Sequence, residues 1–395
     1  MVNYYLKTTV KNIIRGETDM KVLILSCSTG QGHNSAALAV YENLKSHQVD
    51  CEFMDALLFA GKKTSNAVCK TYATVANKAP HVFGLAYRAG GIISNTKTKS
   101  PVYFANTRYA RKMYDYITSN GFDMVVTSHL FPAQTLTYLK KKYNLTVFTM
   151  AIATDYTSIP FWEETRLDYY VIPHRDLIRE FYKKGIPREK LLPFGIPVSR
   201  AFCAKTTKEQ ARKELSLPLE GFEILIMSGS MGFGHMAPLM RAFLKKYGSK
   251  VTLIVMGGNN KDLKASLRER FSDYKNVHIL DFTQQVSLYM DSADLLYTKP
   301  GGLTSTEALV KGIPTIHTAP IPGCETKNAR FFAAHGLSFY AKSTWEQISY
   351  GCLLYQNPDA RRAMQKAQAE HALPEAAESI YQFLLKQETP SADIH

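Results

Sequence analysis

The sequence contains no Asp or Glu between Ala56 and Tyr114, and it contains no D-x-D triplet anywhere. No apolar run approaches the roughly 18–20 residues that a membrane-spanning helix needs, and the N-terminus lacks the apolar core and cleavage site of a secretory signal. The six cysteines form no C-x-x-C pair. That spacing argues against a zinc site and a disulfide framework, and it favours a protein of the reducing cytosol.

The chain is long enough for large buried cores. It has 395 residues, of which 45% are hydrophobic and 21% charged, and this balance excludes a largely disordered protein. At about 100–200 residues per domain, we expect two or three domains. The 48 Lys and Arg residues exceed the 34 Asp and Glu residues and give a net charge of +14. Such a chain is expected to bind an anionic partner: nucleic acid, an acidic membrane or a phosphorylated ligand.

The acid-free stretch narrows that choice. Its ten basic residues are interspersed with large aliphatic and aromatic side chains such as Leu58 and Phe104. This mixture is typical of a surface that docks on an anionic bilayer, where each basic residue contributes about 1 kcal/mol. We therefore expect residues 56–114 to bind a membrane surface, with a solvated basic face over an ordinary core as the alternative. The lysines assigned to docking are Lys62, Lys63, Lys97 and Lys99.

Strands and helices alternate from Lys21 onward. In the first half we expect strands at 21–27, 49–54, 122–127, 146–151 and 168–172, with helices at 34–45, 103–119 and 174–184. In the second half we expect strands at 223–227, 251–256, 277–280, 295–298 and 315–317, with helices at 207–215, 236–247, 261–271, 284–290 and 304–311. Because βαβ units build parallel sheets, the sequence predicts an α/β protein of two Rossmann-like domains that face each other across a cleft.

A segment with two prolines and a glycine, residues 192–204, separates the two series. The predicted divisions are an N-terminal extension at 1–19, one Rossmann-like domain at 20–198 and a second at 199–365. Residues 366–395 are expected to form C-terminal helices and a tail that pack back on the N-terminal domain. Ligands of such sheets bind beyond the carboxyl ends of the strands, so the loops at these ends are the candidates for a site.

The first candidate loop follows the strand at 21–27 and has the sequence S-T-G-Q-G-H-N-S-A. Its glycines let the backbone approach a ligand, so Thr29, Gly30 and Gly32 are candidates for a loop that contacts a diphosphate or an acceptor. His33 could take a proton from an alcohol near pH 7, or it could only cap the helix or touch a phosphate. Asp155, after the strand at 146–151, is a candidate supporting carboxylate or second base.

Two more Gly-rich loops follow the first strands of the second half. Gly229, Ser230 and Gly232 offer backbone N–H groups at a helix start, which suits a diphosphate, although a plain tight turn is the alternative. Asn259, in the next loop, is more simply explained as a helix cap than as a ligand contact.

The segment at 298–309 carries the strongest signal. A Gly301-Gly302 turn opens a helix with hydroxyl side chains in its first turn, Thr304 and Ser305 among them. Glu307 follows one turn inside, where a carboxylate can accept both hydroxyls of a ribose or only interact with the helix dipole. At a second helix start, Glu325 and Asn328 lie three residues apart, so they share a face and could hold the hydroxyls of a sugar.

Together these motifs resemble the monogalactosyldiacylglycerol synthase and processive diacylglycerol glucosyltransferase group. Ser26–Ala37 is similar to the group's S-x-x-T-G-x-G-H-x-x-x-A, Thr298–Ala308 to its T-K-x-G-G-x-T-x-x-E-A, and Pro322–Asn328 to its P-G-x-E-x-x-N. Thr154–Tyr156 resembles the group's T-D-Y segment, and Gly195–Pro197 its G-I-P hinge. The resemblance covers roughly residues 20–365, and the motifs occur in the group's order.

The resemblance implies a GT-B fold whose C-terminal domain holds a UDP-sugar and whose N-terminal domain docks on the membrane and takes a lipid acceptor. The implied reaction is transfer of a hexose, with glucose favoured over galactose, to diacylglycerol with inversion at the anomeric carbon, on the cytoplasmic face of the membrane. No cofactor or metal is implied, because helix N-termini and side chains stabilise the leaving diphosphate. The residues assigned to the nucleotide-sugar are Gly229, Ser230, Gly232, Asn259, Gly301, Gly302, Thr304, Ser305, Glu307, Glu325 and Asn328.

The chain departs from the group at two places, and other functions fit some of its features. Cys324 stands where bacterial relatives have a glutamine, and the arginine that follows G-I-P is shifted to Arg200, so the choice of sugar and a hinge cation stay open. A UDP-N-acetylglucosamine 2-epimerase of the same fold would have no use for the acid-free stretch, and a different lipid acceptor is a further alternative. A nucleic-acid binder fits the net charge but not the aliphatic residues and Gly-rich turns.

Overall fold

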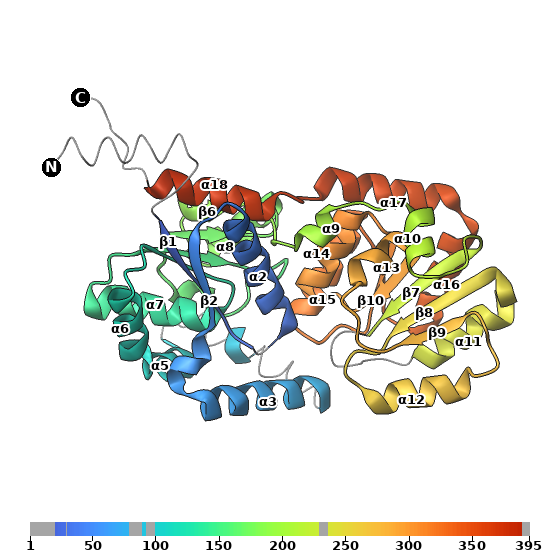
Figure 1. The fold of residues 1–395 in the computed structure, drawn as a ribbon, viewed down its shortest axis with the longest axis horizontal. Coiled ribbons are helices and arrows are strands. Elements are labelled where there is room, and N and C mark those ends of the chain that lie inside the picture. Colours follow the sequence, from blue (N-terminus) through green and yellow to red (C-terminus); the bar gives the residue numbers. More distant parts are fainter. Residues whose placement is uncertain (1–19, 29, 79–88, 92–98, 229–235, 389–395) are drawn as a thin grey trace. The chain divides into compact units, whose positions relative to one another are not determined.

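The computed structural model describes residues 20–28, 30–78, 89–91, 99–228 and 236–388. The chain divides into an N-terminal unit (Met1–Tyr72, Tyr87–Ser199 and Pro374–His395) and a C-terminal unit (Ala73–Ala86 and Arg200–Leu373). Each unit holds a six-stranded sheet in which every pair of neighbouring strands is parallel (Figure 1). The predicted pair of Rossmann-like domains is confirmed.

The sheet of the N-terminal unit has the strand order β2-β1-β3-β4-β5-β6. Its central strands are short apolar runs, and residues 22–25 of β1 have no solvent exposure. Strands with this composition are stable only where helices cover both faces of a parallel sheet. The strands are β1 (Lys21–Ser26), β2 (Asp50–Asp55), β3 (Met124–Thr127), β4 (Phe148–Ile152), β5 (Tyr169–Val171) and β6 (Leu191–Leu192).

Helices α2 (Gln31–Ser46) and α7 (Leu130–Tyr143) cover opposite faces of this sheet. Helix α2 connects β1 to β2, whereas α7 connects β3 to β4 in the opposite direction along the sheet. Because crossovers between parallel strands are right-handed, the two helices lie on opposite faces. Helix α18 (Ala376–Glu388) returns from the far end of the chain and packs along α2 (Figure 1). Further helices of this part of the chain include η1 (Ala56–Ala60), α3 (Lys62–Lys78), α5 (Pro101–Thr107), α6 (Ala110–Ser119) and α8 (Ile178–Lys183).

The helix predicted at 103–119 is wrong as a single element, because the structure divides it into α5 and α6. In a continuous helix the Asn106 carbonyl would accept the N–H four residues later. Instead it accepts the hydroxyl of Thr135 from α7 at 3.1 Å, and the Asn106 side chain bonds Gln134 at 2.8 Å. These contacts with a neighbouring helix replace the helical hydrogen bond and end α5.

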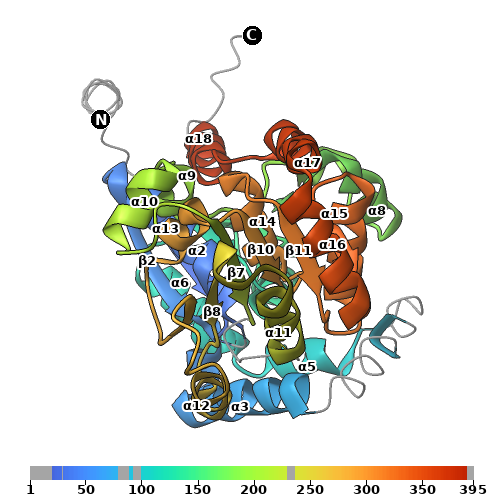
Figure 2. The same ribbon diagram turned by 90° about the vertical axis from the view of Figure 1, so that its right-hand side faces the viewer.

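The sheet of the C-terminal unit has the order β12-β11-β10-β7-β8-β9. Its strands are β7 (Phe222–Met227), β8 (Val251–Met256), β9 (Val277–Leu280), β10 (Leu295–Thr298), β11 (Thr315–Thr318) and β12 (Phe339–Ala341). Helices α11 and α16 pack against each other, and α14 packs against α17 (Figure 2). The helices are α9 (Arg200–Cys203), α10 (Lys208–Glu214), α11 (Met236–Tyr247), α12 (Lys261–Arg270), α13 (Val286–Ser292), α14 (Gly302–Lys311), α15 (Cys324–Ala334), α16 (Thr344–Gln356) and α17 (Pro358–His371).

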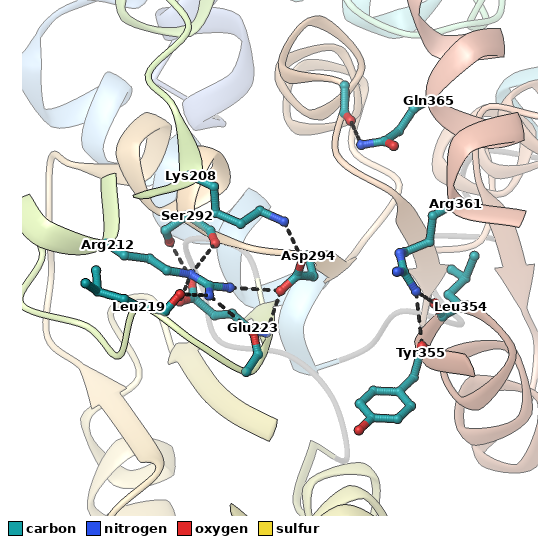
Figure 3. A network of polar contacts seen from close by, with 12 residues as sticks. Lys208, Arg212, Leu219, Glu223, Ser292, Asp294, Leu354, Tyr355, Arg361 and Gln365 are labelled. Carbon is teal, nitrogen blue, oxygen red and sulfur yellow. Dashed lines mark hydrogen bonds and ion pairs between the residues drawn. The ribbon is translucent and has the colours of Figure 1, made fainter. Parts of the chain in front are cut away.

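A buried arginine joins α10 to the amino ends of β7 and β10. Arg212 is 3% exposed and donates to the Asp294 carboxylate at 2.9 Å and to the Ser292 carbonyl at 3.1 Å, while Glu223 lies 3.5 Å from it (Figure 3). Asp294 also pairs with Lys208 and accepts the Glu223 backbone N–H at 2.8 Å. Burial raises the pKa of Glu223 to about 7, and its bond from Ser292 and the charge of Arg212 oppose that rise. Of the two cations in this network, Lys208 is partly exposed, whereas Arg212 is the one that is out of reach of water.

Removal of that cation is expected to destabilise the protein. Arg212→Ala leaves two carboxyl groups in the interior without their guanidinium, so we expect the free energy of unfolding to fall by about 3–5 kcal/mol. The measurement is urea unfolding followed by circular dichroism. Lys213→Ala is the control, because Lys213 forms only an exposed pair with Glu209 on the same helix. Equal stability of the two variants would contradict the structural role of Arg212.

Candidate active site

The order of strands reverses once in each sheet, and candidate residues such as His33 and Thr304 lie at these two places. In the N-terminal unit, β1 leads to β2 on one side while β3 continues on the other. In the C-terminal unit, β7 and β10 have the same relation. Such a switch point leaves an open crevice at the carboxyl ends of the strands, where ligands bind. Residues Thr29, Lys97, Gly229, Ser230 and Gly232 lie outside the described residues.

His33 is the third residue of α2 and is half-buried at the switch point of the N-terminal unit. Its Nδ1 atom lies 2.9 Å from the carbonyl of Ser128, the residue that follows β3. The same nitrogen lies 2.8 Å from the hydroxyl of Thr154, which follows β4. The ring meets the His129 ring edge to face, with 4.6 Å between centroids. Sequence analysis missed Ser128 and His129, since nothing in the local sequence connects them with His33.

The environment of His33 favours the neutral imidazole. Burial lowers the pKa of His33, and the nearby Asp155 carboxylate opposes that change without reversing it. Burial also lowers the pKa of His129 strongly, and His33 lowers it further. A neutral imidazole has one nitrogen with a free lone pair and can accept a proton.

The loop before His33 is fixed by hydroxyl and amide groups. Gly30 is the N-cap of α2 in an extended conformation, and Gly32 lies in the first turn. The Asn34 side chain accepts the Ser26 hydroxyl at 2.6 Å, and the Ser128 hydroxyl donates to the His33 carbonyl at 2.9 Å. The carboxyl ends of β1 and β3 therefore hold the start of α2 in place, and glycines leave the backbone open at this point.

In the C-terminal unit, Gly301 caps α14 and only one of the two predicted hydroxyls is accessible. Thr304 is half-buried, whereas Ser305 has no exposure and its hydroxyl bonds His317 Nε2 at 3.0 Å. Thr306, the third hydroxyl of this turn, donates back to the Gly302 carbonyl at 2.7 Å. Thr304 therefore remains the candidate for a ligand contact at the N-terminus of α14, and the Ser305 side chain is committed to the protein interior.

Glu307 is half-buried one turn further along α14. Burial raises the pKa of Glu307 to about 8. Among the residues that the structure describes, none forms an ion pair or hydrogen bond with its carboxyl group. A carboxyl group in this condition gains stability from any ligand that offers it hydroxyl donors.

Glu325 and Asn328 lie on α15 and contact the turn before α14. Glu325 pairs with Lys299 at 3.1 Å and accepts the Ile321 N–H at 2.6 Å. Asn328 has no exposure and donates to the Pro300 carbonyl at 3.0 Å. A cavity of about 270 Å³ opens beside Lys299 at the carboxyl ends of β7, β10 and β11. The structure thus brings the two helix starts together at one edge of the sheet.

The capping expectation for Asn259 is wrong by one residue. Asn259 is exposed, and Asn260 is the N-cap of α12, with its side chain accepting the Leu263 N–H at 3.0 Å. The helix begins at Lys261, so only the residue directly before it has the extended backbone and the reach of a cap.

The lysines that sequence analysis assigns to membrane docking differ in their surroundings. Lys62 and Lys63 are exposed at the start of α3, whereas the Lys99 ammonium donates to the Glu164 carbonyl at 2.6 Å and lies over the Tyr103 ring. Among the large apolar residues of the acid-free stretch, Leu58 is 48% and Phe104 59% exposed.

In the described part of the chain, no helix combines the length and apolar character needed to cross a bilayer. Within the same residues, no cluster of three potential metal ligands occurs.

Two family models match consecutive parts of the chain. Residues 33–198 match the monogalactosyldiacylglycerol (MGDG) synthase model, and residues 223–380 match the glycosyltransferase family 28 C-terminal domain. A processive diacylglycerol beta-glucosyltransferase of Staphylococcus saprophyticus is 26% identical over 371 residues, which are 92% of each chain. The enzyme of the same name from Staphylococcus carnosus is 29% identical over 249 residues, 63% of each chain.

A solved structure agrees with this match at the level of fold. MurG of Acinetobacter baumannii superimposes with a TM-score of 0.64 at 15% identity, covering 93% of this chain and 99% of MurG. The protein therefore has a GT-B fold with two parallel sheets. In both halves the chain is similar to the monogalactosyldiacylglycerol synthase and processive diacylglycerol glucosyltransferase group, and it is a UDP-sugar-dependent glycosyltransferase that forms glycolipid.

Proposed function

We propose that the protein transfers a hexosyl group, glucose rather than galactose, from its UDP carrier to the primary hydroxyl of diacylglycerol, with inversion. The observation that carries this proposal is the half-buried His33, whose Nδ1 faces a carbonyl while Nε2 is the remaining ring nitrogen. A neutral imidazole in this state is suited to deprotonate an alcohol. The names of the staphylococcal relatives support diacylglycerol as acceptor and glucose as sugar.

In the proposed reaction, the acceptor hydroxyl gives its proton to His33 Nε2 as its oxygen bonds the anomeric carbon. The bond from that carbon to the UDP oxygen breaks, and UDP leaves with the bonding electron pair. Attack opposite the leaving group inverts the configuration. Asp155 supports the imidazolium that forms, since its charge already favours protonated His33.

We assign the donor to the C-terminal unit. Glu307 would accept the ribose hydroxyls, and Thr304 with the N–H groups at the start of α14 would stabilise the diphosphate without a metal ion. Glu325 would hold hydroxyls of the sugar, and its pairing with Lys299 fixes its position. The buried Asn328 would act mainly by holding the Pro300 carbonyl, and so the turn that precedes α14.

Membrane docking is assigned to the acid-free stretch of the N-terminal unit. Exposed Lys62 and Lys63 supply charge, while Leu58 and Phe104 offer apolar surface. The start of α3 and helix α5 lie at the same end of this unit in two perpendicular views (Figures 1 and 2). We propose that this end rests on the cytoplasmic face of an anionic membrane, which also delivers the acceptor.

The main alternative, a UDP-N-acetylglucosamine 2-epimerase, is not favoured by the family models or by the relatives. A transferase with a different lipid acceptor remains the second candidate, because the residues that would contact the lipid tails are not identified. Incubation with radiolabelled UDP-glucose or UDP-galactose and diacylglycerol liposomes, followed by lipid separation, distinguishes these functions. A water-soluble labelled product with no labelled lipid would contradict the proposal.

Replacement of His33 is expected to abolish the chemical step selectively. His33→Ala should lower kcat by about 10²–10⁴-fold, the usual contribution of a positioned base, while UDP binding stays unchanged. Lipid product is measured by scintillation counting, and UDP affinity by calorimetry. His278→Ala is the control, because His278 lies on β9 in the other unit. A His33→Ala rate within tenfold of wild type would exclude His33 as the base.

Glu307 should make UDP binding depend on pH. Burial raises the pKa of Glu307 to about 8, so below pH 8 most of this carboxyl group is protonated. Because the ribose hydroxyls bind the carboxylate form, UDP binding below pH 8 must release the proton of Glu307. Affinity should rise up to about tenfold per unit from pH 6 to 8 and then level off. Glu307→Gln should weaken binding about ten- to hundredfold at pH 8 and remove this component. The titration of UDP itself is common to both proteins, so identical pH slopes in calorimetry would reject the ribose contact.

Charge reversal at the start of α3 is expected to release the protein from anionic vesicles. Lys62→Glu with Lys63→Glu changes the local charge by four units, each worth about 1 kcal/mol at the surface. Flotation on vesicles that contain phosphatidylglycerol should collapse, and wild-type binding should weaken as salt increases. Lys245→Glu with Lys250→Glu, two exposed residues of the C-terminal unit, is the charge-matched control. Equal flotation of the two double variants would show that this surface does not dock.

A further inference from the structure

Two oxygen atoms, from the loops that follow two different strands, meet one nitrogen of His33. The Ser128 carbonyl lies 2.9 Å and the Thr154 hydroxyl 2.8 Å from Nδ1. Ser128 is 1% and Thr154 8% exposed, so water does not replace either contact easily. Both residues follow neighbouring strands of the same sheet, β3 and β4, whose register fixes their separation. The position of the ring is therefore set by the sheet and not by α2 alone.

The chemistry of these partners determines the tautomer. A carbonyl oxygen only accepts hydrogen bonds, so the proton of the neutral imidazole must sit on Nδ1. Because a ring nitrogen that carries hydrogen cannot accept a hydrogen bond, the Thr154 hydroxyl cannot donate to Nδ1. The Thr154 oxygen instead accepts a hydrogen bond from the Nδ1–H group, which it shares with the Ser128 carbonyl. This leaves Nε2 as the only basic position of the ring. The other tautomer would set the Nδ1 lone pair against the lone pairs of the Ser128 carbonyl.

The contact to Thr154 gains strength when His33 is protonated. In the imidazolium form, Nδ1–H becomes a charged donor, and charge-assisted hydrogen bonds are roughly twice as strong as neutral ones. The other groups that face the ring are Asp155, whose charge favours the imidazolium, and His129, which burial keeps neutral. A hydroxyl acceptor on Nδ1 therefore stabilises the proton-accepting step more than the resting state.

We propose that Thr154 is a positioning residue of this enzyme: its hydroxyl and the Ser128 carbonyl share the Nδ1 proton of His33 and reserve Nε2 for the acceptor alcohol. The assignment rests on the proposed role of His33 as general base. Thr154 does not touch the substrate in this account and acts only through the imidazole. The methyl group of Thr154 is not required, so serine should replace threonine.

The test compares Thr154→Val, which keeps the shape and removes the hydroxyl, with Thr154→Ser, which keeps the hydroxyl. We expect Thr154→Val to lower kcat about three- to tenfold, the effect of one lost hydrogen bond, with KM for the UDP-sugar unchanged. The acid limb of its pH–rate profile should move to lower pH by about half a unit to one unit, because the imidazolium loses an acceptor. Thr154→Ser should restore both values.

Nitrogen NMR of ¹⁵N-histidine-labelled protein provides a readout that does not depend on activity. The His33 signals, assigned by their absence in His33→Ala, should show a protonated Nδ1 and a bare Nε2 at neutral pH. In Thr154→Val the midpoint of the His33 titration should fall, as in the rate profile. A wild-type His33 with its proton on Nε2, or an unchanged titration in Thr154→Val, would overturn the proposal.

The two proposals fail in different ways. If His33→Ala keeps full activity, the base role is wrong, yet the NMR tautomer and titration still test the contact with Thr154. If His33→Ala is inactive while Thr154→Val matches wild type in rate and pH profile, the base role stands and the positioning role of Thr154 is wrong. UDP affinity measured on each variant confirms that the protein is folded before either conclusion is drawn.

Discussion

The fixed hand of the crossovers between parallel strands determines where each unit can hold a ligand. Since α2 and α7 leave neighbouring strands in opposite directions, they must lie on opposite faces, and the carboxyl ends of β1 and β3 are left open between them. The same constraint opens the edge at β7 and β10. His33 and the start of α14 occupy these positions. The chemistry of both units therefore depends on topology before it depends on any single side chain.

Much of this arrangement is visible in the sequence, because parallel strands buried on both faces are short apolar runs. The strands at Val251–Met256 and Leu295–Thr298 have the predicted bounds for this reason. The sequence does not predict helix α7, for two reasons. Its N-cap is the side chain of His129, and histidine is not a usual capping residue; the first turn of the helix also contains a proline.

The parts that sequence analysis could not supply depend on contacts across the sheet. Three hydroxyls fall in one turn of α14, and only the packing of that helix decides that Ser305 faces inward to His317. The partners of His33 are 95 and 121 residues away from it in the chain. No local pattern connects residues at such distances, whereas the register of β3 and β4 brings them together.

The buried titratable groups of this protein are of two kinds: some form ion pairs with each other, and others are shifted by burial toward their neutral forms. Arg212 and Asp294 are both charged, and each compensates the other within hydrogen-bond distance. For His33, burial outweighs the charge of the nearby Asp155, and for Glu307 burial is the cause of the raised pKa, so both groups favour their uncharged forms. The first arrangement serves stability, because the charges are satisfied before any ligand arrives. The second leaves each group ready to change its protonation state when a ligand provides the partner.

Because α18 is synthesised last, the core of the N-terminal unit cannot be completed until the end of translation. Ile380, Tyr381 and Leu384 complete the same core as Ala37 and Val40 of α2, although the whole C-terminal unit separates them in the chain. At about 5–20 residues per second, a ribosome needs roughly ten seconds or more to make that unit. During this interval the apolar face of α2 lacks its cover. This core of the N-terminal unit is therefore completed only after translation has passed the last strand of the other unit.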